Sequence, residues 1–140
     1  MKNYVLDSYA VLTYFQDEEG AAQVEELLRE ADQGKATLFL STVNLGEVAY
    51  ITQRKAGTEG RRKLLTALDL LPVTVVDADR SLALKAAEIK AKQAISYADC
   101  FALALARQSG GTVITGDPEF KKAEKTAPIH WLPEKPKQRS

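Results

Sequence analysis

The chain has 140 residues, 45 % of them hydrophobic, and its 19 basic and 19 acidic residues cancel. This length suits one domain with a sizeable core, and the zero net charge excludes a protein that attracts nucleic acid through a global positive field. His130 is the only histidine, which excludes a paired-histidine nuclease or a histidine-rich zinc site and leaves oxygen ligands for any metal.

Strand-like and helical segments alternate along the chain. In order, the first half is predicted to form a strand at 3–6, helices at 8–15 and 20–33, a strand at 38–40 and a helix at 41–55. The second half is predicted to form a helix at 58–71, a strand at 73–76, helices at 78–92 and 96–108, and strands at 112–115 and 129–132. Gly34 and Pro72 mark two of the helix ends.

Strands separated by helices predict right-handed crossovers and an α/β fold, with a parallel sheet covered on both faces. We expect a single domain over residues 1–132 and a polar, proline-containing, disordered tail at 133–140. The basic residues of this tail, which we expect to serve solubility, are Lys135, Lys137 and Arg139.

Cys100 is the only cysteine, so a disulfide within the chain is excluded and a reducing compartment is favoured. We interpret it as a small core residue and not as a nucleophile. The N-terminal segment MKNYVLD has too short an apolar core for a signal peptide, and no apolar run approaches the ~18 residues of a spanning helix. We therefore expect a cytoplasmic protein that does not use a membrane.

Four acidic residues fall near the carboxyl ends of predicted strands, where ligands gather in open α/β sheets. They are Asp7 after the first strand, Glu47 in the helix after the second, Asp99 in the first turn of a later helix, and Asp117 after the fourth strand. Three of them have an ordinary alternative role. Asp7 and Asp117 could cap helices, and Asp99 follows Ser96 in an arrangement close to a capping box.

Glu47 has no such alternative, because it lies too deep in its helix to cap it. Its helical stripe is otherwise apolar except for Asn44, and no lysine or arginine partner for the four acids is evident nearby. Two carboxylates ~4 Å apart repel by about 4 kcal/mol at an effective dielectric of ~20. A converging set would therefore take up protons or recruit a hard divalent cation such as Mg²⁺ or Mn²⁺.

Four stretches of the chain resemble the VapC type of PIN-domain ribonuclease, the toxin of a bacterial or archaeal toxin–antitoxin pair. They are YVLDSYAVL, STVNLGEVAY, ISYADCFALALA and VITGDPEF, and they occur in the family's order and spacing. The resemblance implies a PIN-like three-layer α/β/α sandwich. It carries the family's catalytic and metal-binding acids onto Asp7, Glu47, Asp99 and Asp117, and its supporting positions onto Ser8, Asn44 and Thr115.

The implied activity is hydrolysis of RNA phosphodiester bonds by an endoribonuclease that uses one or two Mg²⁺ or Mn²⁺ ions. Asp7, Asp99 and Asp117 would hold the metal, and Glu47 would be a direct or water-mediated ligand. Thr115 would orient the last carboxylate or a metal-bound water. The resemblance also implies a cognate antitoxin and a homodimer.

The sequence also bears on three other functions. A non-catalytic RNA-binding or scaffold module stays open, as does a DNA-directed nuclease, because nothing in the sequence reads the 2′-OH. An aspartyl phosphotransferase is disfavoured, because Tyr9 stands where a haloacid-type phosphatase needs a second aspartate.

Substrate binding must come from local charge. The first candidates surround residues 57–60 and are Arg54, Lys55, Arg61, Arg62 and Lys63; a solvated helix end explains the same pattern. A second candidate set, just past Asp117, is Lys121, Lys122 and Lys125. The apolar residues of the 8–15 helix and the leucines at 64–71 exceed what one helix face buries, which predicts protein contacts unless all of them are core.

Overall fold

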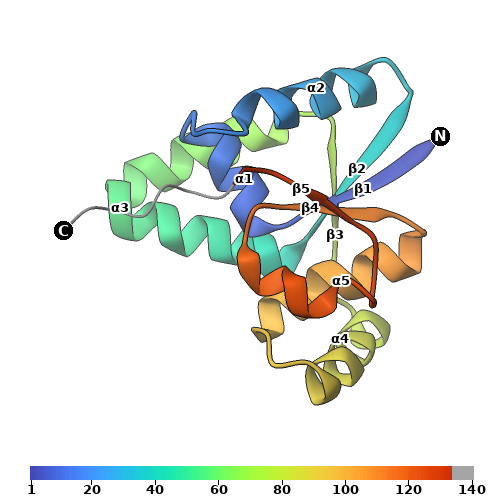
Figure 1. The fold of residues 1–140 in the computed structure, drawn as a ribbon. Helices are drawn as coiled ribbons and strands as arrows, with labels where there is room; N and C mark the ends of the chain where they lie inside the picture. Colours follow the sequence, from blue (N-terminus) through green and yellow to red (C-terminus); the bar gives the residue numbers. More distant parts are fainter. Residues whose placement is uncertain (134–140) are drawn as a thin grey trace.

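The computed structural model describes residues 1–133, so the rest of the expected tail, with its three basic residues, lies outside the described part (Figure 1). Its centre is a five-stranded sheet of order β3-β2-β1-β4-β5 in which all strand pairs are parallel. The strands are β1 (Lys2–Leu6), β2 (Ala36–Ser41), β3 (Val73–Val76), β4 (Thr112–Thr115) and β5 (Ile129–Trp131). The predicted parallel sheet is confirmed.

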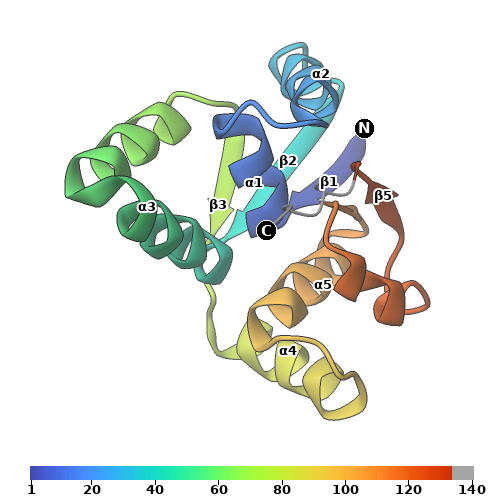
Figure 2. The same ribbon diagram turned by 60° about the vertical axis from the view of Figure 1, so that its left-hand side comes forward.

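Helices cover both faces of this sheet. They are α1 (Ser8–Phe15), α2 (Ala21–Asp32), α3 (Thr42–Asp69), α4 (Arg80–Lys92), α5 (Tyr97–Ser109) and the 3-10 helix η1 (Pro118–Ala123). Figure 2 shows α1, α2 and α3 on one face and α4 and α5 on the other. The chain moves outward from β1 to β3 and then returns past β1 to β4 and β5. Because crossovers are right-handed, this reversal changes the face that the helices cover.

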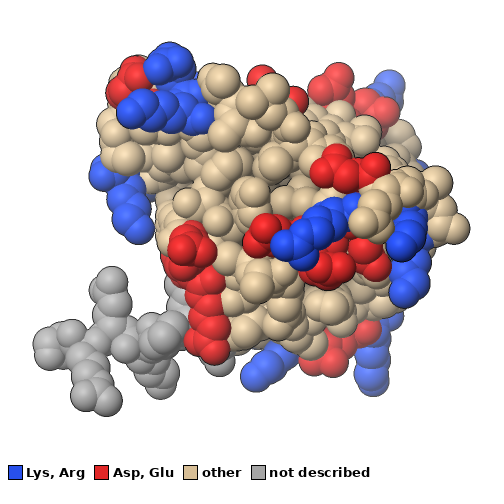
Figure 3. All heavy atoms as spheres, turned by 90° about the horizontal axis from the view of Figure 1, so that it is seen from above, with Lys and Arg blue, Asp and Glu red and all other residues tan. Residues whose placement is uncertain are grey.

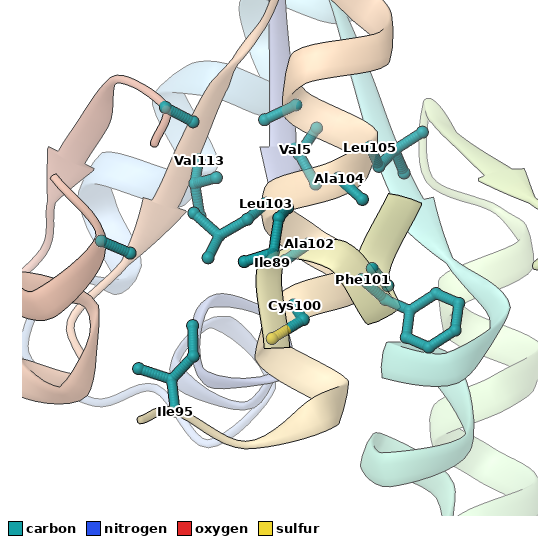
Figure 4. Close-up of a cluster of buried hydrophobic side chains, with 14 of the residues drawn as sticks. Val5, Ile89, Ile95, Cys100, Phe101, Ala102, Leu103, Ala104, Leu105 and Val113 are labelled. Carbon is teal, nitrogen blue, oxygen red and sulfur yellow. The ribbon is translucent and has the colours of Figure 1, made fainter. Parts of the chain in front are cut away.

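The three-layer α/β/α sandwich is thereby confirmed, and alternating strand residues build its two cores. Val5 and Val113 pack against α4 and α5, whereas the next residue of each strand, Leu6 and Ile114, packs against α1 to α3. Figure 4 shows the first core, in which residues 100–106 of α5 are all buried. Cys100 is one of them and is fully buried, as expected. None of the helices in residues 1–133 has the length and apolar character needed to cross a membrane.

The predicted pair of helices at 41–55 and 58–71 is confirmed as the two arms of α3, which spans Thr42 to Asp69 and is interrupted at Gly57. The φ of 72° and ψ of −177° at Gly57 are non-helical and suit only glycine. The break turns α3 sharply (Figure 2). The helix α4 differs slightly from its prediction, because it begins at Arg80 and not at residue 78. Asp79 caps it by accepting a 2.9 Å hydrogen bond from the Leu82 N–H.

Most of the apolar side chains on α1 and on the second arm of α3 are core. Val11, Leu12, Leu64 and Leu68 are buried within the chain, whereas Leu70 is 83 % exposed. The all-core alternative therefore accounts for most of these residues, although not for all of them.

Candidate active site

Asp7 follows β1 and lies where the chain order of the sheet reverses, between β1 and β4. This is the crevice in which open α/β sheets bind ligands. Asp7 caps α1, since its Oδ1 accepts a 2.8 Å hydrogen bond from the Ala10 N–H. The carboxyl group is 2 % exposed and also accepts a hydrogen bond from Thr115. Capping occupies only one of its oxygens, so the cap and a site role coexist.

The strand β4 ends at Thr115, and Gly116 and Asp117 follow it. The Thr115 Oγ1 accepts a 3.0 Å hydrogen bond from the Asp117 N–H and donates to Asp7, so one hydroxyl links the ends of β1 and β4. Asp117 in turn caps η1 by accepting a 3.0 Å hydrogen bond from Glu119. A Cβ on Gly116 would lie 2.4 Å from the Tyr9 ring, so the close approach here requires glycine.

Glu47 comes from α3 and is held by two supporting residues. The Ser8 hydroxyl donates a 2.5 Å hydrogen bond to Glu47 Oε1, and Asn44 Nδ2 lies 3.4 Å from the same oxygen. Asn44 is fully buried; it also donates to the Ala98 carbonyl at 3.2 Å and accepts from Ser41 at 2.9 Å. Asn44 therefore ties the first turns of α3 and α5 together and positions Glu47.

Asp99 lies in the first turn of α5 and is half-buried. Its N–H donates a 3.2 Å hydrogen bond to Ser96 Oγ, which caps the helix, as the capping-box spacing predicted. The cap roles proposed as alternatives for Asp7 and Asp117, and the Ser96 cap before Asp99, are thus all present in the structure.

These elements bring all four predicted acids to one pocket of about 300 Å³. Its lining residues are Asp7, Ser8, Tyr9, Leu12, Glu47, Ile51, Ser96, Asp99, Asp117 and Glu119. Five carboxyl groups therefore face a space that no lysine or arginine of the described residues lines. Caps alone do not explain why acids from four separate elements converge without a cationic partner.

Burial and mutual repulsion raise the pKa values of two of the acids, Asp7 and Asp99. Burial raises the pKa of Asp7 from 3.8 to about 8; hydrogen bonds from Thr115 and Ala10 oppose the rise, and the negative charges of Asp99 and Asp117 add to it. Burial likewise raises the pKa of Asp99 to about 6, and the charges of Asp117, Glu47 and Glu119 contribute. The carboxyl groups therefore lie close enough to affect one another, and a divalent cation would reverse these shifts.

The donors of the pocket are carboxyl groups that already have hydrogen-bond partners. Within residues 1–133, no three acidic, histidine or cysteine side chains already converge into a metal-binding group. The hydrogen bonds explain this, because Glu47 is turned toward Ser8, while Asp7 and Asp117 are turned toward backbone N–H groups. The donor chemistry still fits Mg²⁺ or Mn²⁺, since it is all oxygen and acidic, and among the five acids only Glu119 pairs with a lysine, Lys122, within the described residues. Binding an ion requires these side chains to rotate.

The predicted RNA-binding residues gather around the Gly57 break of α3, outside the pocket, and all five are exposed. Two of them bind neighbouring side chains: Arg61 donates a 2.8 Å hydrogen bond to Gln53, and Arg62 pairs with Glu59. On the face drawn in Figure 3, acidic and basic side chains are interspersed without a broad positive patch.

Lys55 and Lys63 line a second hollow, a groove of about 560 Å³ between the end of α1 and the two arms of α3. Phe15 and Leu64 are among its apolar walls. In the second candidate set, Lys122 lies 3.6 Å from Glu119 and donates a hydrogen bond to the Ala94 carbonyl.

The family model of the PIN domain matches residues 4–126. The chain belongs to the PIN-domain family. A search of curated proteins found no match. The fold is that of solved VapC-type toxins. VapBC2 of Rickettsia felis bound to promoter DNA matches with a TM-score of 0.73 and 16 % identity, over 93 % of this chain and 98 % of that one. DNA-bound VapBC of Salmonella typhimurium matches with a TM-score of 0.72 and 19 % identity, over 93 % of this chain and 98 % of that one. VapC20 of Mycobacterium tuberculosis, a toxin that cleaves the sarcin–ricin loop, matches with a TM-score of 0.68 and 17 % identity, over 86 % of this chain and 94 % of that one.

Sequence reasoning missed several residues of this PIN-domain pocket, chiefly Tyr9, Ile51 and Glu119. Glu119 had a visible signal, because it follows Asp117 by two residues in the GDPEF stretch. Ile51 is four residues after Glu47 and so shares its side of α3. Tyr9 had none, since its place depends on the close approach of α1 to Gly116.

Proposed function

We propose that this PIN-domain protein is a Mg²⁺- or Mn²⁺-dependent endoribonuclease, the toxin of a toxin–antitoxin pair. The observation that carries the proposal is the pocket of five carboxyl groups, without lysine or arginine, at the crevice between β1 and β4. Unpaired acids at half-buried positions destabilise a fold unless a cation joins them. Solved structures of the same fold include a toxin that cleaves ribosomal RNA at the sarcin–ricin loop, which supports RNA as the substrate class.

Each residue of the pocket has a role in this proposal. Asp7, Asp99 and Asp117 would hold the ion or ions, with Glu47 as a direct or water-mediated ligand. When bound, Mg²⁺ or Mn²⁺ supplies positive charge that activates a water molecule and neutralises the phosphodiester. Thr115 fixes the Asp7 carboxyl group relative to the Asp117 backbone, and Ser8 and Asn44 fix Glu47. The N-termini of α1 and α5 open on the pocket and favour a phosphate.

The proposed partners are an antitoxin protein and a second copy of this chain, in the cytoplasm. Solved relatives in fold are VapBC toxin–antitoxin complexes, which supports the antitoxin. The candidate surface is the groove beside Lys55 and Lys63. The apolar walls of this groove, which include Phe15 and Leu64, suit an apolar segment of a protein partner.

The test is cleavage by purified, antitoxin-free protein of structured RNA, unstructured RNA and DNA of the same sequences, with Mg²⁺, Mn²⁺ or EDTA. We expect RNA cleavage only with metal, lowered roughly a hundredfold or more by Asp99→Asn. The matched control is Asp69→Asn, which removes an exposed acid at the end of α3 and should cleave normally.

Two results would separate the alternatives. Metal-dependent cleavage of DNA but not RNA would assign the same chemistry to a DNA-directed nuclease. Absence of cleavage of any nucleic acid, or equal cleavage by Asp99→Asn and the wild type, would contradict the proposal and leave the non-catalytic module.

A further inference from the structure

Exposed aromatic side chains are rare in this protein. Within residues 1–133 only two are exposed, Tyr50 at 45 % and Tyr97 at 46 %. Tyr50 lies on α3 three residues after Glu47, and its neighbour Ile51 lines the acidic pocket. Residues three apart on a helix have Cβ atoms about 5–6 Å apart. Tyr50 therefore lies at the rim of the pocket, within one helical turn of a carboxyl group of the site.

Tyr97 is equally exposed but is held differently. It precedes Asp99 by two residues, which is about 200° around α5, so the two side chains leave opposite sides of the helix. The Tyr97 hydroxyl donates a 3.3 Å hydrogen bond to the Ala83 carbonyl of α4, and its ring packs edge-on against Phe101 with centroids 5.0 Å apart. These contacts direct Tyr97 toward α4 and away from the pocket.

Arg54 supports the Tyr50 ring from one side. Its guanidinium carbon lies 4.9 Å from the ring centroid, a cation–π arrangement that holds the ring in place. Arg54 forms no ion pair with an acidic side chain within residues 1–133. It follows Glu47 by seven residues, two turns along the same side of α3. Its charge is therefore available to a phosphate that approaches the pocket along this helix.

A half-exposed aromatic ring, a guanidinium without an acidic partner and an acidic pocket proposed to cleave phosphodiesters together suit a site for single-stranded nucleic acid. A protein partner could also cover the Tyr50 ring. Such a partner would not account for the positive charge of Arg54 beside the acidic pocket, whereas a phosphate would. A base inside a duplex is already stacked on both faces, so only an unpaired base can lie on Tyr50.

On the basis of the proposed ribonuclease function, we propose that Tyr50, backed by Arg54, stacks on an unpaired base next to the scissile phosphate. Tyr50 is then a positioning residue that restricts cleavage to loops and single strands. Arg54 contributes by fixing the ring and by contacting the adjoining phosphate.

The first test is steady-state cleavage of an unpaired RNA by Tyr50→Leu, Tyr50→Phe and Tyr97→Leu. Stacking on an aromatic ring contributes ~1–3 kcal/mol per base, so Tyr50→Leu should lower kcat/KM about 5- to 100-fold. Tyr50→Phe keeps the ring and should stay within about twofold of the wild type. Tyr97→Leu, which removes an equally exposed tyrosine that faces α4, should also cleave normally, and melting temperatures confirm that each variant is folded.

A second test locates the base. Single abasic nucleotides are placed in turn on each side of the cleavage point, and one position should reduce cleavage by the wild type while leaving Tyr50→Leu unaffected. With 2-aminopurine at that position, in an Asp99→Asn background that does not cleave, bound RNA should show quenched fluorescence with Tyr50 and recovered fluorescence with Tyr50→Leu.

The outcomes separate this inference from the proposed function. If the wild type cleaves RNA with metal and Tyr50→Leu cleaves every substrate equally well, the nuclease stands and the stacking role is wrong. If Tyr50→Leu changes only the oligomeric state or antitoxin binding, the exposed ring is a protein contact and the stacking role is again wrong. If the wild type cleaves no RNA, both proposals fail together.

Discussion

Asp7 serves the fold and the site with a single carboxyl group. It caps α1 through one oxygen and lies buried at the end of β1, beside Thr115. Burial of an ionisable group without a cation opposes folding at neutral pH, and this explains why its pKa rises to about 8. A divalent ion bound beside Asp7 would offset this cost, which supports the proposal that Asp7 is a metal ligand.

Replacing Asp7 with Asn should stabilise the metal-free protein at pH 7 and abolish cleavage. The pKa of about 8 in the folded state lies above the ordinary value of 3.8 for an aspartate. The folded protein therefore binds more protons than the unfolded chain between these values, and its stability falls as the pH rises from about 4 to 8. Asn does not ionise, so the variant should lack this loss and gain roughly 2–4 kcal/mol at pH 7.

Urea denaturation in EDTA between pH 4 and 8 measures this difference, with Asp69→Asn as the control for removing an exposed acid. If the unfolding free energies of Asp7→Asn and the wild type change equally with pH, the prediction is contradicted, because Asp7 would then have the same pKa in the folded and unfolded states. Adding Mn²⁺ should raise the stability of the wild type most at the upper end of this pH range.

Thr115→Val should weaken both the fold and the site, because the fully buried hydroxyl accepts from the Asp117 N–H and donates to Asp7. Valine leaves the N–H without a partner, which costs about 1–3 kcal/mol of unfolding free energy. Thr115→Ser keeps the hydroxyl and should restore most of the activity. Thermal denaturation and cleavage rates of the two variants check this, and equal behaviour of Val and Ser would contradict the link between the strands.

Helices and strands were predictable where a short stretch of sequence determines them by itself. Leu6 and Val113 lie in short apolar runs, which parallel strands show because both of their faces are buried. Gly34 and Pro72 ended helices as expected. The boundary between the two arms of α3 near Gly57 was also predicted, but the sharp bend there was not, because sequence alone does not give the backbone angles of a glycine.

Two glycines of α3 should respond to alanine with opposite signs. Gly57 has a positive φ and an extended ψ, so Gly57→Ala should lower the unfolding free energy by about 1–3 kcal/mol even though its Cβ would meet nothing within 4 Å. Gly46 has helical geometry and equally open space, so Gly46→Ala should raise it by about 0.5–1 kcal/mol. Urea denaturation of both variants measures these changes. A higher unfolding free energy for Gly57→Ala than for the wild type would contradict the positive φ at Gly57.

The order of the strands in the sheet brings together site residues that lie far apart in the sequence. That Asp7 and Asp117 are neighbours depends on the pairing of β1 with β4, strands separated by more than 100 residues, and no local pattern encodes that order. The turning of Glu47 toward Ser8, and the presence of Glu119 in the pocket, depend on side-chain packing that only the assembled structure shows. Asp7 and Asp117 were predictable because each follows a strand, and Glu47 and Asp99 because the stretches around them resemble a known family. The hydrogen bonds of the four acids were not predictable.

A chain shortened to residues 1–133 should fold as the full chain does, because both cores lie within that range. We expect an unchanged melting temperature and a cleavage rate within about twofold of the full chain, in agreement with a solubilising role for the last residues. An unchanged melting temperature with lost cleavage would instead assign RNA contacts to Lys135, Lys137 or Arg139.

The central claim is that the acids of four elements form a metal site and are not merely helix caps. Calorimetric titration of Mn²⁺ into the purified protein at pH 7 tests this without knowledge of the substrate. We predict one or two ions bound by the wild type and by Asp69→Asn, and at least tenfold weaker binding by Asp99→Asn. Binding that Asp99→Asn leaves unchanged, or no binding by the wild type, would contradict the claim.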